Sequence, residues 1–269
     1  MEVEVRGHTL DGAYAVWFDG RGLQANVLKV EKIKSSVGEQ EKQNGATSTE
    51  DNRQGYRVRL HVSINNSAVP AVYVLRLVSP RGISNPLPFI VHSDSIVLEA
   101  TSNHDTPNQA QRLSFPTVLH GRISSKGELD YYSFDALKNQ TVFFEVFSSP
   151  VGVSAGASIP FNKHVGSGFD ARLGLYEDRG SWLDPNRVRS LALSDEPVFS
   201  SIDPNPRLIY QFKEDGRYIL EVGAFSGSGQ PPPMGFGGPD HVYLLRIASD
   251  GASSISDRAK DSWQTLLAR

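Results

Sequence analysis

Short runs of alternating apolar and polar residues recur along the chain, with turn-forming residues between them. In residues 56–62, Val58, Leu60 and Val62 alternate with basic side chains. Because successive side chains of a β-strand point to opposite faces, this run predicts a strand with one face in a core and one in solvent. Comparable runs occupy residues 3–5, 15–18, 23–30 and 71–78. Several such strands with no helical period between them predict an immunoglobulin-like β-sandwich in residues 1–92.

The second part of the chain carries stronger strand patterns. Residues 141–147 place Val142, Phe144 and Val146 on one face. Apolar faces of this kind can pack on each other as stacked sheets about 10 Å apart. Aromatic residues at period-two positions are expected in the core rather than on a ligand surface: Phe134, Phe144, Tyr218 and Tyr243. The pattern predicts a second sandwich in residues 93–250.

The chain is therefore predicted to be all-β, with two consecutive antiparallel β-sandwiches and a short helix in residues 251–269. The helix follows from the helical spacing of Ala259, Trp263 and Leu266, which Ser254 or Ser256 can cap. Two alternatives stay open for this helix. It packs on the sandwich, or it leads into a further domain.

Three stretches break the strand pattern. Residues 34–57 are almost wholly polar and cannot bury enough apolar area to offset their ordering entropy, so they predict a mobile hairpin insertion, with a partner-binding loop as the alternative. Residues 151–168 are rich in Gly, Ser and Ala, and residues 225–240 are rich in Gly and Pro. Met234 and Phe236 make the last stretch a candidate contact surface, unless the loop packs its own side chains.

Composition excludes several classes of partner and site. The formal net charge is −3 and the pI is near 6.2, so nucleic acid and anionic membranes are not expected as partners. The absence of cysteine rules out disulfides, thiolate metal sites and a cysteine nucleophile. No run approaches the roughly 18 apolar residues of a membrane span, and the acidic residues Glu2 and Glu4 stand where a signal peptide needs an apolar core. We therefore expect no membrane insertion and a longer natural protein.

Catalytic motifs are missing from the sequence. The seven histidines form no His-x-x-x-His pair, and the serines include no Gly-x-Ser-x-Gly elbow. The glycine-rich stretches lack the Gly-Lys-Ser/Thr ending of a phosphate-binding loop. We predict that the chain is not an enzyme and has no catalytic residues.

A succession of motifs in the second part resembles a known family. Residues 104–113 read His-Asp-Thr-Pro-Asn-Gln-Ala-Gln-Arg-Leu, residues 119–123 read Leu-His-Gly-Arg-Ile, and residues 127–134 read Gly-Glu-Leu-Asp-Tyr-Tyr-Ser-Phe. This order resembles the opening of the bacterial pre-peptidase C-terminal domain, and the likeness continues to residues 243–247. The resemblance implies a jelly-roll-like β-sandwich appended to secreted enzymes and cell-surface proteins.

The first part resembles a different module. Residues 10–20 and 75–89 are similar to the bacterial immunoglobulin-like domains called IPT or TIG. Such domains serve as spacers or interaction surfaces and lack catalytic residues.

The resemblance also implies a calcium site. In the similar collagen-binding domains of bacterial collagenases, calcium lies between the segment that leads into the sandwich and the next acidic turn. The residues that match in this chain carry the hard oxygen ligands that calcium prefers: Glu99, Asn103, Asp105, Glu128 and Asp130. Ser102 and His104 depart from the family pattern, because they replace a Glu and an Asn. The alternative is that Asp105 caps a turn while Glu128 and Asp130 lie in a solvated hairpin.

Together these observations predict a noncatalytic accessory or interaction region of a larger exported bacterial protein. The resemblance implies an extracellular, cell-surface or periplasmic location. Other domains of the same protein, extracellular polysaccharide and protein matrix are the expected partners. One alternative is a dedicated polysaccharide- or matrix-binding module, which an exposed row of aromatic residues on one sheet face would favour. The other is a secretion or processing segment of a secreted hydrolase.

Overall fold

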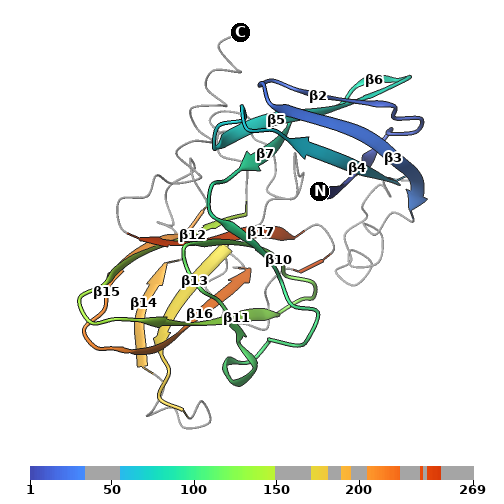
Figure 1. Ribbon diagram of the computed structural model, residues 1–269. Coiled ribbons are helices and arrows are strands. Elements are labelled where there is room, and N and C mark those ends of the chain that lie inside the picture. The colour runs from blue at the N-terminus through green and yellow to red at the C-terminus, as the bar shows by residue number, and fades with distance from the viewer. Residues whose placement is uncertain are drawn as a thin grey trace, which may run out of the picture. The chain divides into compact units, whose positions relative to one another are not determined.

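The computed structural model describes residues 1–33, 55–148, 171–180, 189–194, 205–224, 237–238 and 241–249. The chain divides into two compact units, residues 1–91 and residues 92–269. The described residues of both units are almost entirely strands and turns, as the pattern predicts (Figure 1). The predicted insertion between residues 34 and 54, the loop at 151–168, residues 225–236 and the predicted helix at 251–269 lie outside the described residues.

The first unit consists of two sheets. One is antiparallel in the order β1, β4, β3, with bounds Glu2–His8, Gly55–Ile64 and Leu23–Ile33. The other is built on a central β5, with β2 along one edge and both β6 and β7 along the other. Its strands span Ala15–Phe18 (β2), Ala71–Ser79 (β5), Gly82–Ile83 (β6) and Leu87–Val91 (β7). The resemblance of this unit to an IPT or TIG domain stays a prediction.

The core of the first unit follows the alternation in the sequence. Val58, Leu60 and Val62 on β4 are buried against Leu75 and Leu77 of β5, while the basic side chains between them face outward. Full burial of an aliphatic side chain of this size contributes about 1.5–3 kcal/mol. The predicted one-sided strand is confirmed.

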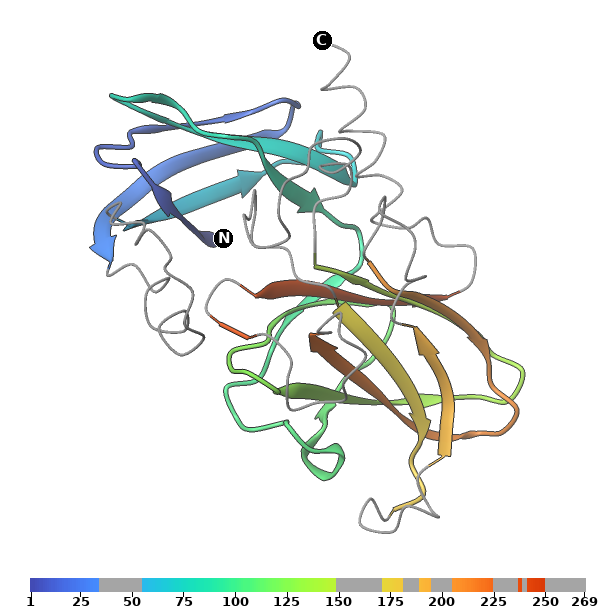
Figure 2. The ribbon, with the colours of Figure 1, turned by 180° about the vertical axis from the view of Figure 1, so that it is seen from behind.

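The second unit is a sandwich of two five-stranded sheets, which form two layers in Figure 1 and in the view from behind (Figure 2). The first sheet has the order β15, β12, β17, β10, β8, with bounds Arg207–Gln211, Thr141–Phe147, Val242–Ser249, Thr117–Arg122 and Ser95–Leu98. The second has the order β14, β13, β16, β11, β9, with bounds Arg189–Ser194, Ala171–Glu177, Gly216–Ala224, Leu129–Ala136 and Gln111–Arg112.

Each sheet of the second unit ends in a parallel pair. β8 runs parallel to β10, and β9 runs parallel to β11, so the sandwich is mixed rather than wholly antiparallel. Both edge strands come from the stretch that leads into the unit, because the chain adds one short strand to each sheet before the longer strands β10 and β11. A 3₁₀ turn, Pro107–Gln109, lies between them.

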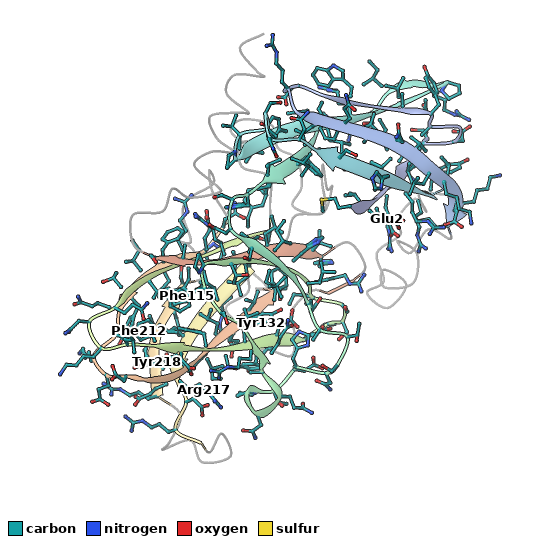
Figure 3. The ribbon with its side chains drawn as sticks, in the orientation of Figure 1. Glu2, Phe115, Tyr132, Phe212, Arg217 and Tyr218 are labelled. Carbon is teal, nitrogen blue, oxygen red and sulfur yellow. The ribbon has the colours of Figure 1, made fainter. Side chains whose placement is uncertain are left out.

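Aromatic side chains fill the space between these two sheets (Figure 3). The ring of Phe134 lies 5.5 Å from that of Phe144, 5.9 Å from that of Phe212 and 6.1 Å from that of Tyr218. Such ring pairs contribute about 0.5–1.5 kcal/mol beyond their buried area. The predicted core positions Phe134, Phe144, Tyr218 and Tyr243 are confirmed.

The outward faces of the central strands are less exposed to solvent than the alternation predicts. On β12, Phe143, Glu145 and Phe147 are buried although they alternate with the core residues. Among the described residues, no helix is long and apolar enough to span a membrane.

Candidate metal centre

The polar residues of interest lie where a lead-in segment, residues 99–110, crosses from one sheet of the second unit to the other. Backbone bonds hold this segment in place. The Glu99 N–H donates to the carbonyl of His120 on β10 at 3.0 Å, and the Tyr131 N–H on β11 donates to the carbonyl of His104 at 3.0 Å. The Gln111 side chain bridges the segment, accepting from the Ala100 N–H at 2.8 Å. The segment is therefore fixed to both sheets.

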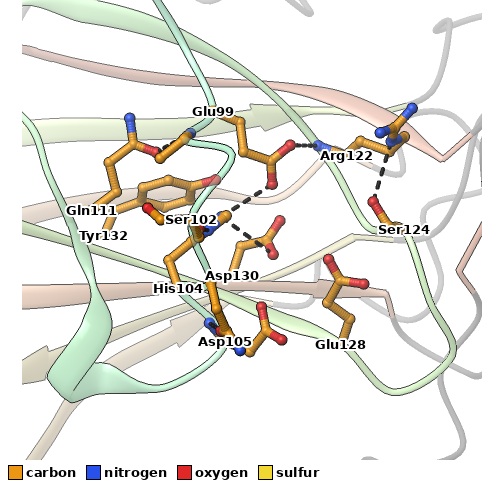
Figure 4. Close-up of polar contacts among 12 residues, drawn as sticks. Glu99, Ser102, His104, Asp105, Gln111, Arg122, Ser124, Glu128, Asp130 and Tyr132 are labelled. Atoms are coloured by element: carbon orange, nitrogen blue, oxygen red, sulfur yellow. Dashed lines mark hydrogen bonds and ion pairs between the residues drawn. The ribbon is translucent and has the colours of Figure 1, made fainter.

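Three side chains converge between this segment and β11 (Figure 4). The imidazole Nε2 of His104 lies 3.1 Å from Oε1 of Glu99 and 3.7 Å from Oδ1 of Asp130. His104 is 5% exposed and Asp130 is 0% exposed. One ligand atom from each residue lies within 4.8 Å of the others. We call this group the histidine cluster.

Every member of the histidine cluster is held by its other polar atom. Nδ1 of His104 lies 3.0 Å from the Ser102 carbonyl, which can only accept, so Nδ1 carries a proton. Oε2 of Glu99 accepts the Arg122 N–H at 3.0 Å. Oδ2 of Asp130 accepts the Tyr243 hydroxyl at 2.6 Å, and the hydroxyls of Tyr243 and Tyr132 lie 2.6 Å apart. One nitrogen and two oxygens are thereby turned toward a common point.

The glycine of the second motif makes room for this arrangement. Gly121 on β10 pairs directly with Tyr243 on β17. A Cβ at position 121 would lie 2.5 Å from the Tyr243 ring and 2.6 Å from its hydroxyl oxygen. Only glycine lets the Tyr243 side chain lie across the strand and reach Asp130.

Burial sets the electrostatics of the histidine cluster. Loss of hydration raises the pKa of Asp130 to about 8, against the opposing hydrogen bond from Tyr243 and with further raising by nearby carboxylates. Burial also raises the pKa of Glu99, although His104 counteracts it. Oδ1 of Asp130 is buried and accepts no hydrogen bond. The cluster therefore favours a bound positive charge, either a proton or a metal ion.

A second group shares Asp130. Asp105, Glu128 and Asp130 each offer one carboxylate oxygen, again within 4.8 Å. Asp105 is exposed, whereas Oε2 of Glu128 accepts both the N–H and the hydroxyl of Ser125 at 2.6 and 2.9 Å. We call this group the carboxylate cluster. Its donors are all oxygen and fit calcium, while the histidine cluster does not, because an imidazole nitrogen is not a hard oxygen ligand.

The structure places four of the five predicted residues in these two clusters, which share Asp130: Glu99 in the histidine cluster, and Asp105 and Glu128 in the carboxylate cluster. Asn103 has a different contact, since its Oδ1 accepts the Asp105 N–H at 2.9 Å and closes a turn. The turn is thus capped by Asn103 rather than by Asp105, and the expectation of a solvated Asp130 is wrong. Sequence reasoning missed His104 as a member of the site, having treated it only as a departure from the family pattern.

No protein-family model matches the chain, and no curated protein matches it. Among solved structures, the chain is similar to the pre-peptidase C-terminal domain of a collagenase from Bacillus anthracis, with 14% identity, a TM-score of 0.32, and coverage of 51% of this chain and 93% of that one. It is similar to CorA, a surface-associated copper-binding protein of Methylomicrobium album BG8, with 10% identity, a TM-score of 0.34, and coverage of 52% and 97%. The secreted serine protease VesC from Vibrio cholerae gives 8% identity and a TM-score of 0.26, and the match covers 93% of this chain and 47% of that protease. The family that the motifs of residues 104–134 resemble is thus represented among the similar solved structures.

Proposed function

We propose that this chain is a noncatalytic accessory region of a larger exported protein, in which a cation joins the lead-in segment to the second sandwich. The observation that carries the proposal is the convergence of Asp105, from the lead-in segment, with Glu128, from the turn before β11, and Asp130, on β11. The carboxylates of this cluster come from two separate stretches of the chain and repel each other. A cation that binds between them removes this repulsion. A bound ion therefore favours the docked lead-in segment over a detached one.

Calcium is the ion we propose for the carboxylate cluster. Each of the three carboxylates offers one oxygen, and calcium takes six to eight at about 2.3–2.6 Å. Asp105 is exposed, so water can complete the coordination shell. The role of the ion is mechanical, since it fixes the segment that crosses from β8 in one sheet to β9 in the other.

Thermal unfolding of the full chain in EDTA and in millimolar calcium tests this proposal. Calcium at about a hundred times its dissociation constant adds about 2.7 kcal/mol, which corresponds to about 5–10 °C for a unit of this size. Asp105→Asn should abolish most of the shift, because it removes a ligand whose side chain is exposed. Glu2→Gln is the matched control, since Glu2 is an exposed carboxylate of the first unit. An unchanged melting temperature in calcium would remove this ion from the account.

The chain could also bind a polymer or matrix through a surface outside the two clusters. In the described part of the chain, the exposed aromatic residues are Tyr14 and Trp17, which are 66% and 47% exposed. Trp17 lies on β2, and Tyr14 immediately precedes that strand. Two neighbouring positions do not make a row along a sheet face, so we prefer positioning over dedicated polysaccharide binding. Retention of the chain on insoluble polysaccharide, lost in Trp17→Ala, would reverse this preference.

A further inference from the structure

We propose that the histidine cluster, Glu99, His104 and Asp130, is a site for a divalent ion of the zinc class, distinct from the calcium position and sharing Asp130 with it. The proposal rests on the same docking of the lead-in segment as the proposed function, but it needs no calcium. It starts from a difference between this chain and the family pattern at position 104. The family resemblance implies an amide oxygen at position 104, and the chain has an imidazole there.

The donor set decides the class of ion. The Nδ1–H of His104 donates to the Ser102 carbonyl, so Nε2 is the nitrogen that faces Glu99 and Asp130, either as an N–H donor to Glu99 or as a lone pair that binds a metal ion. A lone pair facing two carboxylate oxygens is repulsive unless a proton or a metal ion lies between them. One imidazole nitrogen with carboxylate oxygens is a ligand set that suits zinc, whereas calcium and magnesium take oxygen ligands.

The spacing is close to what such an ion needs. Zinc binds nitrogen and oxygen at about 2.0–2.2 Å, so adjacent ligands of a tetrahedral site lie about 3.3–3.6 Å apart. The separations from Nε2 of His104 are 3.1 Å to Glu99 and 3.7 Å to Asp130, on either side of that range. Three protein ligands leave a fourth position for water.

An outer shell holds each ligand in place. A carbonyl orients His104, a backbone N–H orients Glu99, and the Tyr243 hydroxyl orients Asp130. Partners of this kind fix the ring tautomer and the carboxylate geometry at metal sites in general. The buried Oδ1 of Asp130, which accepts no hydrogen bond, points into the same space. A buried carboxylate oxygen without a hydrogen bond distinguishes this site from a mere gathering of acidic residues.

The competing explanation is a proton in place of the metal, with His104 as an imidazolium between two carboxylates. Zinc addition to chelator-treated full-length chain, with ring-nitrogen NMR as the readout, separates the two. The proposal predicts that zinc shifts the Nε2 resonance of His104 while Nδ1 keeps its proton, and that the melting temperature rises. An Nε2 that stays protonated at saturating zinc overturns it. This readout uses the wild-type protein, so it does not depend on a variant that folds.

Variants then assign the ligand. His104→Gln should weaken zinc association by more than the about 10–100-fold that loss of an outer-shell partner costs, whereas His61→Gln, at an exposed position on β4, should leave it unchanged. The calcium response should survive His104→Gln and disappear in Asp105→Asn. Zinc binding that is equal in both histidine variants overturns this proposal. Zinc binding without a calcium response supports it and removes calcium from the proposed function.

Discussion

Replacement of Tyr243 by Phe tests whether the buried hydroxyl chain holds the site together. The Tyr243 hydroxyl donates to Asp130 at 2.6 Å and lies 2.6 Å from the Tyr132 hydroxyl, and both tyrosines are fully buried. Tyr243→Phe keeps the ring and leaves no cavity, but it deprives two buried groups of a partner. Each unsatisfied buried group costs about 1–3 kcal/mol, so we expect a loss of about 2–6 kcal/mol in metal-free buffer.

Calorimetric unfolding of the second unit in EDTA measures this loss. Tyr218→Phe is the matched control, because its hydroxyl donates to the Glu214 carbonyl at 2.8 Å from a less buried position. Its removal should cost only about 0.5–1.5 kcal/mol, the net value of an ordinary hydrogen bond. Equal losses in the two variants would refute the reasoning, because the Tyr243 hydroxyl would then be no more than an ordinary contact. Zinc affinity of Tyr243→Phe should also fall by about 10–100-fold.

Two further predictions concern the same site. Gly121→Ala should lower the free energy of unfolding by about 1–3 kcal/mol, because the new Cβ would lie 2.5 Å from the Tyr243 ring. Gly216→Ala should lower it by less, because its Cβ would meet nothing closer than 3.7 Å. Urea titration of both variants compares the two losses. The metal-free chain should lose stability as the pH rises from about 4 toward 8, because Asp130 keeps its proton when folded, with a pKa of about 8, and releases it when unfolded. One proton gives a slope of at most about 1.4 kcal/mol per pH unit, and urea titrations of Asp130→Asn across this range should lack that contribution. A pH profile shared by wild type and Asp130→Asn would contradict the assigned burial of the carboxyl.

Much of the fold could be predicted because strand alternation is a local property. The run at β4 has its buried and outward-facing residues where period two places them, since one face of that sheet packs on a core and the other meets water. The same rule fails for Glu145 on β12, which is fully buried although it alternates with core residues. Burial of an outward face depends on which other segments of the chain cover it. The alternation within one strand does not show which segments these are.

The candidate site was predictable in part. Asp130 shares a strand face with Phe134, so the alternation that predicted Phe134 to be core also indicates an inward-facing carboxylate. A buried carboxylate needs a partner, and that signal was available in the sequence. The position of His104 was not, because it depends on the lead-in segment crossing between the sheets and bonding to β11 through its own carbonyl.

A cation bound at the shared Asp130 would join the lead-in segment to β11. Anomalous X-ray diffraction from crystals grown with zinc and calcium tests it most directly, because it locates the ions themselves. We expect a zinc peak bonded to Nε2 of His104, Oε1 of Glu99 and Oδ1 of Asp130. Density that shows His104 bonded directly to Glu99, with no ion among these three atoms, would contradict it.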